Sequence, residues 1–176
     1  ESVMNGAQKS FMSSTFWTDR IGPVAAIKNA LKSNFHQDVE VVFKSDIVGE
    51  LPDHEVLVLY NLPNVKTTIP AIINKEIASD MPVLFIGGPQ MDWSSLAIER
   101  VGIEVESSDG FQEVGGEEAN GFGLFQSPEG LNSKLKSWPP IISSFGSIKT
   151  SKSLETLIFQ KLANLRTEWP LLGFNK

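Results

Sequence analysis

Short apolar, β-branched runs alternate along the chain with segments of helical period. Val56–Tyr60 and Pro82–Ile86 are near-continuous apolar runs, the pattern of strands buried on both faces of a parallel sheet. Two further runs, Ser10–Phe16 and Val39–Phe43, precede them. The alternation predicts strands that are joined by helical crossovers in a mostly parallel sheet.

Three segments have apolar residues at helical spacing. They are the segment from Gly22-Pro23 to near Asn34, the AIINKEIA segment after Pro70, and Ser94–Val101. Asp92 can cap the third helix and Gly102 can end it, before a further strand at Ile103–Val105. Helices and strands therefore alternate through the first hundred residues.

The last third of the chain has a different pattern. Residues Ser107 to Gly121 are acidic, contain glycine and show little periodicity, which predicts an exposed, mobile excursion between strands. The segments beyond it predict antiparallel additions to the sheet: Phe122–Phe125, Trp138-Pro139-Pro140, Ser153–Leu162 and Trp169–Phe174.

Length and composition limit the possibilities. The 176 residues, 41% of them hydrophobic, suit one domain spanning residues 1–176. No apolar run approaches the roughly 20 residues of a membrane-spanning helix, so we expect a soluble domain. The sequence begins Glu1-Ser2-Val3, without an initiator Met or a signal pattern, which indicates a piece of a longer chain.

Charge and cysteine content exclude several classes of function. The net charge is -6 and the 15 basic residues are scattered, which disfavours a nucleic-acid partner. The chain has no cysteine and hence no cysteine nucleophile, disulfide or thiolate-bound metal. The acidic residues lack the spacing of a calcium loop, so neither a metal nor a cofactor is expected.

Ligands of open parallel sheets bind beyond the carboxyl ends of the strands. The candidate ligand-binding residues at those positions are Asp19, Asn61, Gly87, Gly88, Gln90 and Asp92. The glycine pair can turn backbone N–H groups toward an anion, but two glycines before a proline also form an ordinary tight turn, which is the favoured reading. The sequence has neither a Walker-type lysine nor the three-glycine dinucleotide spacing, so it does not indicate a nucleotide-binding site.

Catalytic side chains are harder to place. His36 and His54 are the only imidazoles, and both precede predicted strands, on the side away from the expected site. They are interpreted as solvated loop residues, with general base as the alternative. No catalytic residue is assigned. Among the four tryptophans, Trp138 beside two prolines is the best candidate for an exposed aromatic contact with a partner, but packing on the domain's own edge is the default expectation.

The motifs GPVAAIKNAL, LVLYNLP, PVLFIGGPQ, GFGLFQ, SWPPIISSFG and LIFQKLANLRTEWPLLGF carry a family resemblance over most of Ser10 to Phe174. The chain resembles the class I glutamine amidotransferase-like domain of Bacteroidetes membrane-anchored proteins with von Willebrand factor A-like segments. The resemblance implies a flavodoxin-like α/β fold: a doubly wound, mostly parallel sheet with helices on both faces and antiparallel C-terminal additions.

The same resemblance bears on function. Catalytic amidotransferases of this class carry a Gly-x-Cys-x-Gly elbow and a C-terminal His-x-Glu. Here the turn reads Gly87-Gly88-Pro89-Gln90-Met91, and no histidine follows His54. The resemblance therefore implies a pseudoenzyme on the periplasmic side of the envelope that contacts a protein partner or other domains of its own chain. The alternative is a small-ligand binder or hydrolase that uses the Gly87–Asp92 turn.

Overall fold

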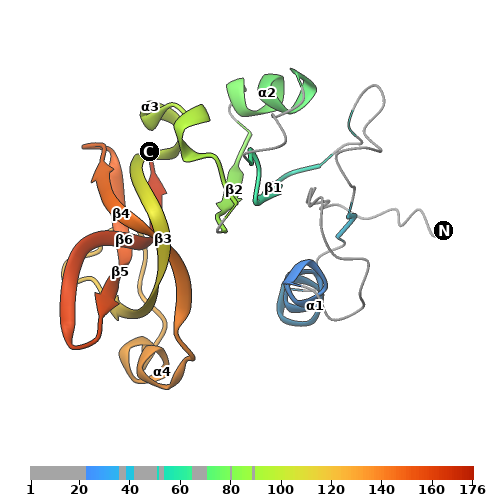
Figure 1. Ribbon diagram of the computed structural model, residues 1–176. Coiled ribbons are helices and arrows are strands. Elements are labelled where there is room, and N and C mark those ends of the chain that lie inside the picture. The colour runs from blue at the N-terminus through green and yellow to red at the C-terminus, as the bar shows by residue number, and fades with distance from the viewer. Residues whose placement is uncertain are drawn as a thin grey trace. The chain divides into compact units, whose positions relative to one another are not determined.

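The computed structural model describes residues 23–35, 39–41, 51, 54–64, 71–79, 81–88 and 90–176. They belong to two compact units, unit 1 (Glu1–Met91) and unit 2 (Asp92–Lys176). Figure 1 labels the elements of both units. No helix within the described ranges combines the length and the apolarity that crossing a membrane would need.

Unit 1 contains a strand–helix–strand motif and a separate helix, α1 (Pro23–Phe35). The motif consists of β1 (Leu57–Tyr60), α2 (Ala71–Ala78) and β2 (Val83–Ile86). The two strands are parallel and pair from Leu57 with Val83 to Tyr60 with Ile86. A parallel pair needs a crossover connection, and α2 lies within it.

The core of unit 1 explains why these segments form the motif. Leu57, Leu59 and Leu62 are fully buried and pack with Ile73 of α2. Burial of each such side chain stabilises the fold by roughly 2 kcal/mol. Both ends of the apolar run thus contribute to one core, which α2 covers with its apolar stripe.

Unit 2 is built around an antiparallel sheet. Its strand order is β4-β3-β5-β6, and short helices precede or connect the strands. In chain order the elements are η2 (Trp93–Ser95), α3 (Ile98–Val101), β3 (Ile103–Glu118), α4 (Leu131–Ser137), β4 (Ile141–Thr150), β5 (Leu154–Leu162) and β6 (Leu165–Asn175).

Strand β3 holds this sheet together because its two halves have different partners. Ile103 to Val114 pair with β4, whereas Gly115 to Glu118 pair with β5. The register shifts between Ser107 and Phe111, where Gly110 adopts φ 127°. An irregularity of this kind bends a strand and increases its twist, and Figure 1 shows β3 as a long curved ribbon.

Helix α4 packs on the sheet through two leucines. Leu131 and Leu135 are buried with Leu157 and Ile158 of β5. Gly116 of β3 lies beneath the helix, and a Cβ there would be 3.0 Å from side-chain atoms of both Leu135 and Ile158. The glycine therefore allows the close approach of helix and sheet.

The predicted fold class is wrong. The described residues form one parallel strand pair and a four-stranded antiparallel sheet, not a doubly wound, mostly parallel α/β sheet of the flavodoxin-like or class I glutamine amidotransferase-like type. The strand–helix–strand alternation holds only around β1 and β2. After Gly102 the strands pair antiparallel, and a sheet with that pairing needs no helical crossovers.

Four local predictions are also wrong in the described residues. The predicted excursion from Ser107 to Gly121 is mostly the second part of β3, and Phe122–Phe125 is not a strand. Strand β2 is not buried on both faces, since Leu84 is 40% exposed. Val39–Val41 carry no strand, and the rest of that run, together with Ser10–Phe16, lies outside the described residues.

Other predictions are confirmed. Helices α1 and α2 and strands β1 and β2 lie where the apolar runs and helical segments put them. Strand β5 matches the run Ser153–Leu162, and Trp169–Phe174 lies within β6. Gly102 ends α3 in the left-handed conformation with φ 79°, as its position after the helix predicts. Ser94–Val101, however, is split into η2 and α3.

Candidate functional site

The predicted site lies in part at the carboxyl ends of β1 and β2. Asn61 follows β1 with φ 52°, and its backbone N–H donates to the carbonyl of Ile86 at 2.8 Å. Asn64 forms an isolated antiparallel bridge with Met91, and Met91 N–H donates to the carbonyl of Gly88 at 3.0 Å. The loops after the two parallel strands are thus tied together.

Asn61 and Gly88 are the two candidates that the structure brings into contact. A Cβ at Gly88 would lie 3.2 Å from Oδ1 of Asn61, so the asparagine side chain occupies the space beside the glycine. That Oδ1 atom is buried and accepts no hydrogen bond from the residues that the structure describes. Leaving a carbonyl acceptor unpaired costs about 1 to 3 kcal/mol. A ligand that donates a hydrogen bond would remove this cost.

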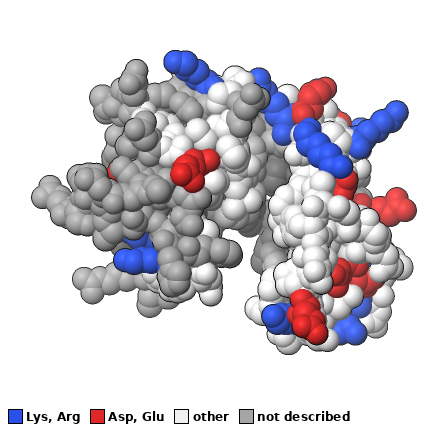
Figure 2. Space-filling model, turned by 180° about the vertical axis from the view of Figure 1, so that it is seen from behind, with Lys and Arg blue, Asp and Glu red and all other residues white. Residues whose placement is uncertain are grey.

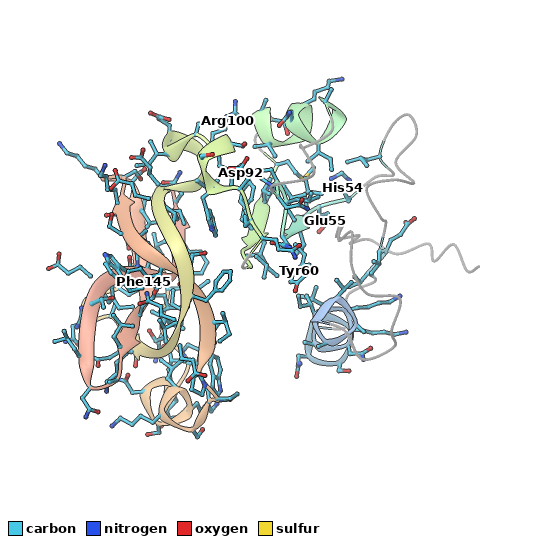
Figure 3. All side chains as sticks on the ribbon, in the orientation of Figure 1. His54, Glu55, Tyr60, Asp92, Arg100 and Phe145 are labelled. Atoms are coloured by element: carbon cyan, nitrogen blue, oxygen red, sulfur yellow. The ribbon has the colours of Figure 1, made fainter. Side chains whose placement is uncertain are left out.

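The neighbouring groups are only weakly suited to chemistry. Tyr60 ends β1, and partial burial raises the pKa of its hydroxyl above the ordinary value, so it stays protonated at neutral pH. Gly87 and Gln90 are exposed. Figure 3 labels Tyr60 together with His54 and Glu55, which precede β1 at the strand's other end. His54 is half-buried, not solvated as predicted.

Asp92 and Asp19 are the other predicted site residues. Asp92 belongs to unit 2, where its carboxylate accepts hydrogen bonds from the hydroxyls of Ser94 and Ser95, each at 2.5 Å. These bonds hold the pKa of Asp92 below its ordinary value. Asp19 and His36 lie outside the described residues. In the described part of the chain, no three His, Asp or Glu side chains form a group that could hold a metal.

A second candidate site lies on unit 2. Four large apolar side chains are exposed in the turn before β4, at the start of β4 and on the neighbouring strand β3. We call this set the apolar ridge: Trp138, Ile141, Ile142 and Phe111, which are 52%, 43%, 49% and 60% exposed. The exposure of Trp138 fits the alternative of a partner contact and departs from the default prediction that it packs on the domain's own edge. Phe111 lies in the segment that the sequence predicts as an exposed excursion.

Strand pairing defines the geometry of the apolar ridge. Phe111 pairs with Ser144, and Glu113 pairs with Ile142. These two pairs lie on one face of the sheet, where Phe111 is diagonal to Ile142. Ile141 pairs with the buried Val114 and lies on the opposite face. Exposed apolar groups therefore occur on both faces at this end of the β3–β4 pair.

Comparison with other proteins adds no assignment. Neither a family model, nor a curated protein, nor a solved structure matches this chain. Function must therefore be argued from the two sites themselves.

The two sites differ in what they can do. The Asn61–Gly88 contact offers one buried acceptor and no paired acid and base, so it suits recognition better than catalysis. The apolar ridge offers aromatic and β-branched surface, which is the composition of protein contact sites. An alternating apolar pattern in Ile141–Thr150 could have indicated β4, but Ser143, Ser144 and Gly146 interrupt it.

Proposed function

We propose that this chain is a non-catalytic interaction module, in which the apolar ridge of unit 2 contacts a protein partner or another domain of the same parent chain. The observation that carries this proposal is the exposure of Ile141, Ile142 and Phe111 in the β3–β4 pair and of Trp138 in the turn that precedes β4. Clustered aromatic and aliphatic groups outside a core mark contact sites, because leaving them in water is unfavourable.

The environment of Asp92 supports the non-catalytic part of the proposal. Both of its carboxylate oxygens accept hydrogen bonds from serine hydroxyls, which lower its pKa. A carboxylate held in this way is a weak general base at neutral pH. A hydrolytic rate on glutamine or a glycoside that disappears in Gln90→Ala or Asp92→Asn would contradict the proposal.

We also propose that the parent protein holds this chain on the periplasmic side of a bacterial envelope. The support is the resemblance of the sequence to a domain of membrane-anchored Bacteroidetes proteins. Protease accessibility in intact and permeabilised cells tests this location. Cleavage only after the inner membrane is opened would exclude it.

Site-specific photo-cross-linking in cells tests the interaction itself. A photoreactive residue in place of Trp138 is expected to give a cross-linked protein adduct. The same residue in place of Asn120, an exposed turn residue in the same unit, serves as the control. Equal or absent adducts at the two positions would show that the apolar ridge does not contact a partner.

The alternative, a small-ligand binder at the ends of β1 and β2, is favoured by one observation. The buried Oδ1 of Asn61 has no donor within the described ranges of the chain, and an amide, hydroxyl or ammonium group of a ligand would supply one. NMR of the asparagine side-chain amides during a small-molecule screen tests this function. Shifts that are lost in Asn61→Gly would support it, and no shifts with any donor-bearing ligand would exclude it.

A further inference from the structure

Strand β4 forms one end of the sheet in unit 2. In the order β4-β3-β5-β6, β3 is its only strand partner among the described residues. The segment from Ile141 to Ile148 contains no charge and no proline. Natural proteins usually protect an edge strand with charges, prolines or short length, because its unpaired backbone groups attract another strand. This ten-residue strand has little of that protection.

The hydrogen bond from Ser151 N–H to the carbonyl of Gly102, at 2.8 Å, indicates which backbone groups face outward. Directly opposed residues of an antiparallel pair alternate between bonded and non-bonded pairs. From the register, residues 147 and 149 bond to β3, whereas Gly146, Ile148 and Thr150 direct their N–H and C=O groups away from it. Between Gly146 and Thr150 the open side of β4 therefore presents alternating donors and acceptors.

Charges of opposite sign lie near the two ends of β4. At the end of β4, Lys149 is the one cation in the described part of the chain that faces two carboxylates of β3. Its ammonium group lies 3.9 Å from Glu104 and contacts Glu106. Before the start of β4, Lys134 and Lys136 of α4 are exposed, and neither forms an ion pair with another residue that the structure describes. Figure 2 shows charged side chains toward the two ends of unit 2 and an uncharged surface between them.

This arrangement is complementary to itself. In one copy, the two ends of β4 are about 26 Å apart, at 3.3 Å per residue. When an antiparallel β4 of a second copy pairs with it, the end of the second strand lies beside the start of the first. Lys134 and Lys136 of each copy then lie near the surplus carboxylate of the other. Glu113, the nearby carboxylate opposite Ile142, lies one strand in from the edge. Because the dimer has a two-fold axis, each favourable contact occurs twice in it.

We infer that β4 pairs antiparallel with β4 of a second copy of this chain, forming a two-fold dimer with one continuous sheet. Ile142 of each copy packs in this interface, and the apolar ridge is partly covered. The inference deepens the proposed interaction function by naming the partner as a second copy.

Sedimentation equilibrium of the purified chain tests the inference. With rising concentration the mass is expected to reach twice the 19.3 kDa of the single chain. Ile142→Lys places a charge at the edge and is expected to abolish dimerisation. Leu124→Lys, at another exposed apolar position of unit 2, should leave it unchanged. A monomer at all concentrations, or equal effects of the two substitutions, would overturn the inference.

Charge reversal separates the interface from a folding defect. K134E/K136E and E104K/E106K should each weaken dimerisation, because like charges then meet at both ends. An equimolar mixture of the two variants should restore it, since both contacts of the mixed dimer again join opposite charges. No recovery in the mixture would overturn the inference. A monomeric chain whose Trp138 still cross-links a different protein in cells would overturn it and leave the interaction function standing.

Discussion

The side-chain amide of Asn175 donates a hydrogen bond at 3.0 Å to the carbonyl oxygen of Arg100, 75 residues earlier in the chain. The same amide donates to Glu99, and its Oδ1 accepts from the hydroxyl of Ser153 at 2.6 Å. Asn175 thus joins the end of β6 to α3 and to the β4–β5 turn, and closes the curl that β3 begins. Figure 3 labels Arg100.

Replacing Asn175 with alanine is expected to lower the free energy of unfolding of unit 2 by about 1 kcal/mol, because its hydrogen bonds to the carbonyls of Glu99 and Arg100 are lost at an exposed position where water replaces them in part. Urea denaturation followed by tryptophan fluorescence measures the change. Asn120→Ala is the control, since Asn120 is exposed in the turn after β3. Equal stability of the two variants would show that the junction contributes nothing.

Gly102→Ala and Gly121→Ala separate backbone strain from packing. Both glycines have positive φ, 79° and 90°, so each substitution costs roughly 1 kcal/mol in strain. A Cβ at Gly102 would also lie 2.7 Å from Leu154, whereas nothing lies within 4 Å at Gly121. Overpacking adds about 1 to 3 kcal/mol at Gly102 alone. If urea denaturation shows equal losses of unfolding free energy in the two variants, the close contact between position 102 and Leu154 is contradicted.

A double-mutant cycle tests the contact between Asn61 and Gly88. Gly88→Ala should destabilise unit 1 by about 1 kcal/mol, because the new methyl group meets Oδ1 at 3.2 Å. Asn61→Gly keeps the positive φ and removes the obstructing side chain. Gly88→Ala should therefore cost clearly less in the Asn61→Gly background. Additive changes in thermal or chemical denaturation would mean that the two residues do not interact.

The carboxylate of Asp92 should contribute an acid-dependent part of the stability. Hydrogen bonds from Ser94 and Ser95 lower its folded-state pKa below the ordinary 3.8. The contribution is complete above that unfolded value and is lost as the pH falls through the folded-state pKa. Carboxyl-detected NMR should show a higher Asp92 pKa in the Ser94→Ala/Ser95→Ala variant.

Glu106 provides the internal reference for that titration. The lowered pKa of Glu106 comes from its hydrogen bond with Lys149 and then from Ser147, neither of which the double substitution touches. An Asp92 pKa that stays constant while both serines are removed would show that the hydroxyls do not hold the carboxylate.

The strand–helix–strand motif was predictable because its signals are local. The run Val56–Tyr60, the helical period of AIINKEIA and the run Pro82–Ile86 each determine an element by themselves. The two strands are close in sequence and are joined by α2, so they pair in parallel. Asn61 and Gly88 came together for the same reason, since the carboxyl ends of parallel strands share one edge.

The sheet of unit 2 was not predictable in this way. Between Ser107 and Glu118, serine, glycine and acidic residues hide the alternation, and a bulge shifts the face that each side chain occupies. This segment is a strand because β4 and β5, which lie tens of residues later, supply its hydrogen-bond partners. The exposure of Phe111 follows from that pairing and was not visible in its neighbours.

By itself, the sequence determined the local elements around β1 and β2, the turn that ends α3, and the absence of cysteine chemistry. Only the tertiary structure produced the antiparallel sheet of unit 2, the hydrogen bonds of Asp92 within that unit, and the exposure of the apolar ridge. The physical reason is that helices and turns form from neighbouring residues, whereas strands acquire partners and faces only through pairing with distant segments.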